Sequence, residues 1–467
     1  MRKVGSHKVS DPGQKSMVEV STISEETEYK VYGYRWVVTV VFGLILLVQA
    51  WLWISFAPIE TQVQHALGLG TTAVRLLALV GPFMFIFVST FAGSLSDNQG
   101  WKFSAGLGVA MLMVAGVVKA ITPHVISSGT GQYWVFLFMQ VLGGIGSAFA
   151  LANLSKMPIK WYPEKQRALG NGLTTMMMYL GTAIGLPLVT IVANVSKTAP
   201  RAVAQAGLNR VLLVVGIATV VAGVLFYVLV KEEPPTPAGP IPEEENIPLR
   251  DSFPILMRST SFRALCVVSL AGYGIYIGLT VTMEKIIGFH GFSTSLASIV
   301  AAVITVGGIV GAGLLPPVSE KLGLRKPFLI VAGAVAIPTT LIIAYVGNKT
   351  VDVSSGLLLG FFLLPALPIT FTMVGEMSEI GPRLAATAVG TLLAVGSIGS
   401  TFVPLLMEVF KKTTLGKVDY RLGLIFLAVL GLAALLAVIF FVKETGPRSS
   451  RPTAKPEEEV TSAQLEA

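Results

Sequence analysis

Two stripes of aromatic and polar side chains are the part of this sequence whose residue types and spacing could bind a solute. Each stripe has a helical spacing that places its members on one helix face. The first consists of Gln49, Trp53, Phe56 and Glu60, and the second of Tyr273, Tyr276, Thr280 and Glu284. Aromatic faces attract ammonium groups by about 0.5–2 kcal/mol when desolvated, and carboxylates at a mouth concentrate cations. These stripes therefore suit a cationic solute, with Glu60 and Glu284 as acids at an outer mouth.

Both stripes also have an ordinary structural interpretation. A polar stripe on a helix in lipid faces the protein interior, because exposure to acyl chains costs several kcal/mol. Packing between helices alone would then account for Trp53 and Tyr276. Glu60 and Glu284 lie near the ends of their apolar segments, where gating and simple residence at the membrane interface are equally good explanations.

The helices that carry the stripes belong to a chain that is too apolar for water. Of its 467 residues, 53% are hydrophobic and 13% are charged, and the mean hydropathy is +0.73. A helix needs about 20 apolar residues to cross a bilayer. Twelve segments come close to or exceed this length: 36–57, 72–95, 103–122, 132–154, 168–194, 208–230, 261–283, 295–317, 327–346, 354–375, 384–410 and 420–442. We therefore predict an all-α integral membrane protein with about twelve transmembrane helices in the cell membrane.

The polar segments divide the chain. We expect an N-terminal tail at 1–34, a six-helix bundle at 35–230, a Pro/Glu-rich linker at 231–258, a second six-helix bundle at 259–443 and a disordered tail at 444–467. An even number of spans places both termini on one side, and basic residues near the span ends favour the cytoplasm. Four basic residues in the loop before the last span would then face outside, against the rule: Lys411, Lys412, Lys417 and Arg421. The net charge of +8 lies in short loops and tails, so we expect no nucleic-acid partner.

An internal repeat relates the two halves. One loop reads Gly93, Asp97, Gly100 and Lys102, and a later loop reads Glu320, Gly323 and Arg325. The three shared positions all differ by the same offset (320−97, 323−100 and 325−102 each equal 223), and so do Trp53 and Tyr276. We expect each loop to be a tight turn in which a glycine permits the bend and the acid pairs with the base. The repeat predicts two pseudo-symmetric bundles.

These loops resemble the motif of the major facilitator superfamily between its second and third spans and its eighth and ninth spans. Here Glu320 replaces the usual Asp, and Pro316 stands where the first loop has Gly93. The resemblance implies two six-helix bundles around a central cavity, with alternating access. It also implies that the loop residues, together with Arg167 and Glu376, act in gating.

Further segments look like the branch named for feline leukaemia virus subgroup C receptors, the haem and choline transporters. They are 52–59 (LWISFAPI), 140–149, 156–164 and 181–185. In that branch the residues matching Trp53 and Tyr276 form the aromatic cage for the choline ammonium. Tyr179 and Ser397 stand where the branch has glutamines, which argues against choline itself, and haem finds no obvious His or Cys ligand. The expected cavity residues are Trp53, Tyr276, Gln49, Tyr273, Gln140, Tyr179, Ser397 and Thr280.

The function that follows is secondary transport of a small organic solute, ammonium-bearing in the choline-like case, by uniport or cation coupling. The alternatives are a proton-coupled exporter, suggested by residues 181–187, and a transport-inactive receptor on the same fold. Glu60, Lys119, Glu284 and Glu408 all lie toward span ends, which leaves facilitated diffusion as open as symport. We expect no enzyme activity, cofactor or metal, and a monomer in the lipid bilayer. The glycine run 307–313 predicts close helix packing rather than a phosphate loop.

Overall fold

The computed structural model describes residues 29–196, 198–239, 247–414 and 417–448. Its first half contains α1 (Arg35–Ile54), α2 (Glu60–Leu67), α3 (Thr71–Gln99), α4 (Trp101–Val125), α5 (Gly129–Leu151), α6 (Lys156–Trp161), α7 (Arg167–Ala193) and α8 (Arg201–Leu229), with the 3-10 helices η1 (Ala57–Ile59) and η2 (Glu164–Gln166). Its second half contains α9 (Leu249–Arg258), α10 (Thr260–Phe289), α11 (Thr294–Leu322), α12 (Lys326–Tyr345), α13 (Lys349–Leu363), α14 (Ala366–Glu376), η3 (Pro382–Leu384), α15 (Ala385–Val409) and α16 (Arg421–Phe441). The short strands β1 (Lys412–Thr414) and β2 (Lys417–Asp419) pair antiparallel before α16.

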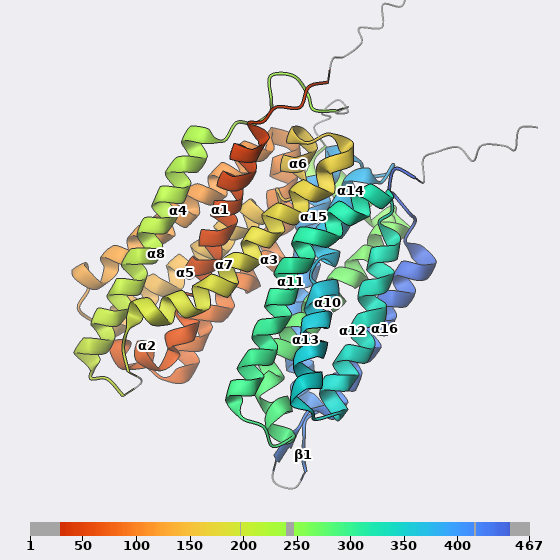
Figure 1. Ribbon diagram of the computed structural model, residues 1–467. Coiled ribbons are helices and arrows are strands. Elements are labelled where there is room, and N and C mark those ends of the chain that lie inside the picture. Colours follow the sequence, from red (N-terminus) through yellow and green to blue (C-terminus); the bar gives the residue numbers. More distant parts are fainter. Residues whose placement is uncertain (1–28, 197, 240–246, 415–416, 449–467) are drawn as a thin grey trace, which may run out of the picture.

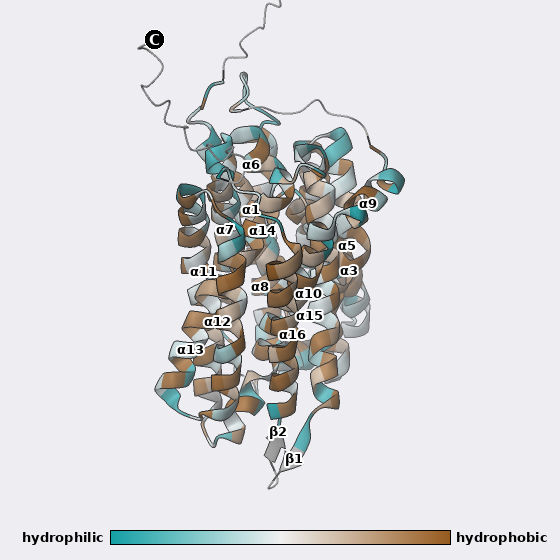
Figure 2. Ribbon diagram, turned by 90° about the vertical axis from the view of Figure 1, so that its right-hand side faces the viewer, coloured by the Kyte–Doolittle hydropathy of each residue, from teal (hydrophilic) through white to brown (hydrophobic). Residues whose placement is uncertain are grey.

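Twelve helical segments of the described chain are long and apolar enough to cross a membrane, which confirms the predicted number of spans. Figure 2 shows hydrophobic residues along their length and hydrophilic residues at the ends of the molecule. Large apolar side chains also face outward: Phe87, Phe138 and Val228 expose 64%, 64% and 73% of their surface. A lipid environment explains this surface, because apolar side chains are stable in contact with acyl chains and the backbone groups form their hydrogen bonds within the helices.

The two halves lie close together at one end and diverge toward the other (Figure 1). The end that holds α6 and α14 is called the terminal face here, and the end that holds α2 and the hairpin of β1 and β2 is called the distal face. Near the terminal face, α3 of the first half touches α15 of the second. A Cβ on Gly93 would lie 2.1 Å from the Ala386 carbonyl oxygen, and a Cβ on Gly390 would lie 2.1 Å from that of Ser89. The helices of the two halves therefore meet backbone to backbone on this side.

Two spans are interrupted where the candidate site was expected. The first span breaks between Ile54 and η1, and Pro58 follows, which has no N–H to donate to the carbonyl one turn earlier. The tenth span breaks between α13 and α14, and Pro368 likewise gives the Leu364 carbonyl no donor. Side chains from other helices bond to carbonyls at both breaks, as described below.

The polar segments are more ordered than the sequence suggested. α9 occupies the second part of the expected linker, and its Leu256 is fully buried. Glu232 accepts hydrogen bonds from the amides of Trp101 and Lys102 at 2.9 and 2.7 Å, and burial raises the pKa of its carboxyl. The Glu444 carboxylate accepts hydrogen bonds from the backbone amides of Arg325 and Lys326. Disorder was therefore a wrong prediction for 444–448, while 1–28 and 449–467 lie outside the described residues.

The glycine run in α11 confirms the prediction of close helix packing. A Cβ on Gly307 would lie 2.4 Å from the Leu357 carbonyl oxygen, and a Cβ on Gly311 would lie 2.2 Å from that of Phe361. On the facing helix α13, a Cβ on Gly360 would lie 1.9 Å from the Ile304 carbonyl oxygen.

We predict that Gly360→Ala lowers the melting temperature of the detergent-purified protein. The added methyl group must push two backbones apart, and overpacking of this kind costs about 1–3 kcal/mol. Gly272→Ala on α10 is the matched control, because nothing lies within 4 Å of its Cβ position, and alanine is the better helix former by about 1 kcal/mol. Equal melting temperatures for the two variants, measured by fluorescence-detected size exclusion after heating, would contradict this account.

Candidate functional site

The first stripe does not lie on one helix as expected: Gln49 and Trp53 belong to α1, Phe56 lies in the break after it, and Glu60 begins α2. Trp53 faces α3. The indole Nε1 of Trp53 donates to the Ala78 carbonyl at 2.9 Å, and its ring lies over Gly81, where a Cβ would be 3.3 Å from the indole Cδ1. Gln49 is buried one turn earlier. Glu60 lies at the distal face and pairs with Arg75 at 3.1 Å. The lack of a side chain at Gly81 thus leaves room for the Trp53 ring against α3.

Behind Trp53 a polar network holds the break in the first span. The Gln140 amide Nε2 donates to the carbonyls of Trp53 at 3.2 Å and Leu77 at 2.8 Å. The Lys119 ammonium donates to the Leu52 carbonyl at 3.3 Å and to the Gln140 Oε1. Lys119 exposes only 1% of its surface. Lys119 lies toward the end of its span in the sequence, yet its side chain is enclosed within the bundle.

The second stripe is part of a tyrosine cluster that involves both halves. Tyr273 and Tyr276 of α10 interact electrostatically with Tyr179, which comes from α7 of the first half. The Tyr276 hydroxyl lies 3.3 Å from the Thr305 Oγ1. The Tyr179 hydroxyl donates to the Leu364 carbonyl at the break of the tenth span, at 3.4 Å. Three phenol rings that the sequence analysis assigned to the cavity therefore lie together.

The remaining expected cavity residues surround this cluster. The Thr280 hydroxyl donates a hydrogen bond to the Tyr276 carbonyl at 2.7 Å. Ser397 is buried on α15, next to Gly396, where a Cβ would lie 2.5 Å from the Tyr273 ring. Glu284 is exposed farther along α10 toward the distal face. Trp53 and Tyr276 make no ring contact with each other in the described structure, so the two stripes remain on separate halves.

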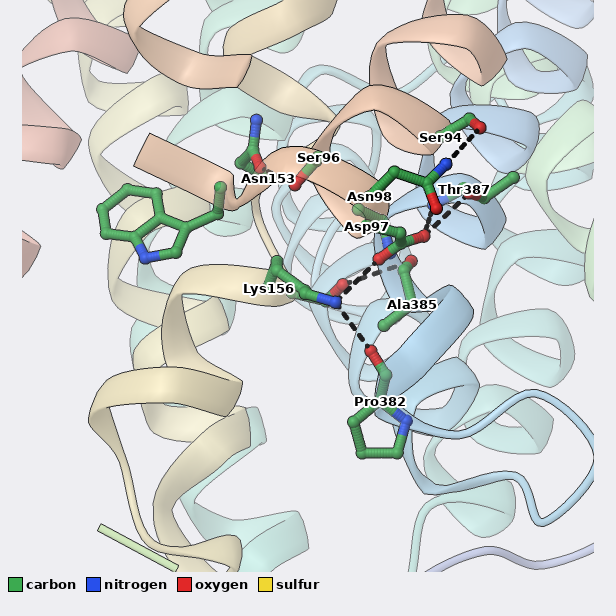
Figure 3. Close-up of polar contacts among 12 residues, drawn as sticks. Ser94, Ser96, Asp97, Asn98, Asn153, Lys156, Pro382, Ala385 and Thr387 are labelled. Atoms are coloured by element: carbon green, nitrogen blue, oxygen red, sulfur yellow. Dashed lines mark hydrogen bonds and ion pairs between the residues drawn. The ribbon is translucent and has the colours of Figure 1, made fainter. Parts of the chain in front are cut away.

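A buried carboxylate joins the halves at the terminal face (Figure 3). Asp97, at the end of α3, accepts hydrogen bonds from the amides of Ala386 and Thr387 at 3.2 and 2.7 Å and from the Thr387 hydroxyl at 2.7 Å. The Lys156 ammonium lies 3.0 Å from the same carboxylate and donates to the Pro382 carbonyl at 3.1 Å. The carboxylate thus caps the first turn of α15, where amide groups and the helix dipole favour a negative charge.

Glu320 repeats this arrangement in the opposite direction. It lies at the end of α11 and accepts hydrogen bonds from the amides of Ala168 and Leu169 in the first turn of α7. Each half therefore contributes one carboxylate that caps a helix of the other half. We call Asp97 and Glu320, with the two helix starts that they cap, the carboxylate clasps.

The turns themselves differ from the sequence expectation. Gly100 and Gly323 do permit the bends, with φ of +94° and +64°. The acid and base of one turn do not pair, however. Asp97 pairs with Lys156 instead of Lys102. Arg325 pairs with Glu376 at 2.8 Å instead of Glu320, and Arg167 interacts electrostatically with the same Glu376.

Lys156 and Thr387 are site residues to which the sequence analysis gave no role. A second offset of 218 relates the fifth and eleventh spans, as in Tyr179 and Ser397 (397−179). Ala168 and Ala386, which donate to the two clasp carboxylates, differ by the same number (386−168 = 218). This offset was legible in the sequence and could have indicated both helix starts.

Relatives with curated names carry transporter names. The chain is 26% identical to solute carrier family 49 member 4 homolog of Xenopus tropicalis over 86% of this chain and 91% of that one. It is 25% identical to the choline/ethanolamine transporter FLVCR1 of Mus musculus over 74% and 64%. It is 26% identical to solute carrier family 49 member A3 of Xenopus tropicalis over 63% of this chain and only 60% of that protein.

Solved structures share the fold at low sequence identity. The fucose:proton symporter FucP of E. coli and the proton:xylose symporter XylE superpose with TM-scores of 0.67 and 0.66, at 13% and 16% identity. They cover 87% and 88% of this chain, and 100% and 97% of their own. The family model of the Major Facilitator Superfamily matches residues 40–404 and 290–466. The chain therefore belongs to the Major Facilitator Superfamily and is a multi-pass membrane protein for secondary transport of small solutes, not an enzyme.

Proposed function

We propose that this transporter carries a small organic cation by alternating access. The binding site opens in turn to the terminal face, where the two carboxylate clasps lie, and to the distal face. The observation that carries the proposal is the placement of Trp53 on the first half and of Tyr276 on the second, at repeat-related positions, with Tyr179 of the first half beside Tyr276. A solute with an ammonium group can contact aromatic faces from both halves at once. Its binding then depends on how the halves are arranged.

The clasps make the terminal face the closed side of the structure described here. Asp97 and Lys156 are both 3% exposed, so separation of the halves must replace their hydrogen bonds with water. Water can satisfy both the carboxylate and the helix start, and the net cost of such an exchange is small compared with its gross energy. The clasp can therefore open and close without unfolding any helix.

The relatives support this class of solute. One carries the name choline/ethanolamine transporter at 25% identity, and both named compounds are small and can bear an ammonium group. Because Tyr179 and Ser397 stand at the positions of the branch's glutamines, the screen below includes choline beside other small ammonium compounds. We further assign the chain to the cell membrane as a monomer with cytoplasmic termini, which makes the clasps the cytoplasmic gate.

We predict that Trp53→Ala and Tyr276→Ala each lower the uptake of the transported cation into proteoliposomes. Loss of one desolvated cation–π contact of about 0.5–2 kcal/mol corresponds to roughly a 2- to 30-fold weaker interaction. A thermal-shift screen of small amines selects the compound. Trp134→Ala and Tyr345→Ala are matched controls, because these residues are 62% and 50% exposed on the outside of the protein. Unchanged uptake of every stabilising compound in both site variants would refute the site assignment.

We also predict that Asp97→Asn and Glu320→Gln open the terminal face. Each change removes the charge that a helix start stabilises by about 0.3–2 kcal/mol. A thiol introduced as Thr391→Cys, which is buried on α15, in a Cys266→Ala background should then react several times faster with a membrane-impermeant maleimide applied at the terminal face. Asp251→Asn is the control, since this acid is exposed on α9. Equal labelling rates for the clasp and control variants would show that the carboxylates do not hold the gate.

A further inference from the structure

Lys119 is a buried ammonium group without an anionic partner. Its Nζ contacts the Leu52 carbonyl, the Gln140 Oε1 and the ring of Phe56, whose centroid lies at 5.4 Å. Within the described part of the chain it forms no ion pair. Buried charges in membrane helices are normally paired and, where they occur, they mark ion or solute pathways. An enclosed lysine that only neutral groups surround therefore needs a functional explanation.

No charge on the neighbouring helices compensates it. α4 packs against α1, α3, α5 and α8. Their titratable and charged residues are Arg35 on α1, Arg75 and Asp97 on α3, Tyr133 on α5, and Arg201, Arg210 and Tyr227 on α8, with Lys102 and His124 on α4 itself. Most of these groups have partners other than Lys119. The pairs are Arg35 with Gln166, Arg75 with Glu60, Asp97 with Lys156, Arg201 with the Ala66 carbonyl, Arg210 with the Ala193 carbonyl and Tyr227 with the Gly106 carbonyl. The groups that contact the ammonium are thus the two oxygens and the phenyl ring named above.

One side chain links Lys119 to the candidate cation site. Gln140 accepts from Lys119 at its oxygen and donates to the Trp53 carbonyl with its nitrogen. The Leu52 carbonyl, which also contacts Lys119, belongs to the residue before Trp53. A positive charge on Lys119 and a cation on the Trp53 ring therefore lie on adjoining parts of one small network, where low dielectric makes their repulsion strong.

We propose that Lys119 is a proton-binding site and that its proton is released when a cation binds at Trp53, so that the transporter exchanges one solute cation for one proton. This inference rests on the proposed function and adds its coupling ion. In the step itself the Nζ–H bond of the ammonium breaks, the electron pair stays on nitrogen, and the proton passes to water. The neutral amine keeps two N–H groups, which continue to donate to Leu52 and Gln140. The total charge of the first half with its bound ligands is the same before and after the exchange, because one solute cation replaces one proton.

The first test uses the wild-type protein in proteoliposomes with choline as the probe, because its quaternary ammonium carries no exchangeable proton on nitrogen. The membrane potential is held at zero with valinomycin and equal potassium, and the lumen is made one pH unit more acidic than the outside. One-to-one exchange accumulates choline in the lumen to about tenfold at equilibrium, whichever way the transporter is inserted. Uptake that ends at equal concentrations overturns the inference and leaves the proposed function intact.

The second test locates the proton. In weakly buffered detergent solution, choline binding to the wild type should release up to one proton per bound choline, with more release as the pH falls below neutral, measured with a pH indicator beside calorimetric binding. Lys119→Met should bind choline without releasing a proton, and Lys349→Met, an exposed lysine on α13, should behave as the wild type. Proton release by Lys119→Met assigns the proton to another group and overturns the inference. If neither choline, ethanolamine nor tetramethylammonium binds the wild type, the proposed function fails and the inference fails with it.

Discussion

The structure depends on one interaction that occurs twice: a carboxylate at the end of a span in one half caps the first turn of a helix in the other half. Asp97 meets the amides of Ala386 and Thr387, and Glu320 meets those of Ala168 and Leu169. Backbone N–H groups at a helix start need an acceptor, and a buried carboxylate needs donors. Each requirement is met across the boundary between the halves. The contact is therefore specific in geometry and yet can be exchanged for water, as a gate requires.

The candidate binding site is arranged around the same boundary. Trp53 remains on the first half, while Tyr273 and Tyr276 belong to the second, and Tyr179 reaches from α7 to the break of the tenth span. A solute can shift the equilibrium between two arrangements only if it contacts them differently. Residues divided between two bodies meet this condition. The helix breaks add to it, because the freed carbonyls of Leu52, Trp53 and Leu364 orient side chains that would otherwise rotate.

The sequence predicted what depends on local pattern or on repetition. Runs of apolar residues indicated the spans, and the offset of 223 related Asp97 to Glu320 and Trp53 to Tyr276. The sequence did not predict which residues become partners through tertiary packing. Lys156, at the start of α6, pairs with Asp97, at the end of α3. Glu444 bonds to the start of α12 although the sequence around it is typical of a polar tail. Lys119 was underrated for the same reason, since distance along a helix does not tell how deeply a side chain is enclosed.

The central claim is that the two halves move against each other around a cation bound between them. Spin labels at His65 on α2 and Lys349 on α13, both exposed, report on the distal face, and double electron–electron resonance measures the distance between them. The account predicts that a bound small cation shifts the population toward a shorter distal distance, as the halves close over it and the carboxylate clasps open. A distance distribution that stays unchanged at saturating concentrations of every cation that binds would contradict it.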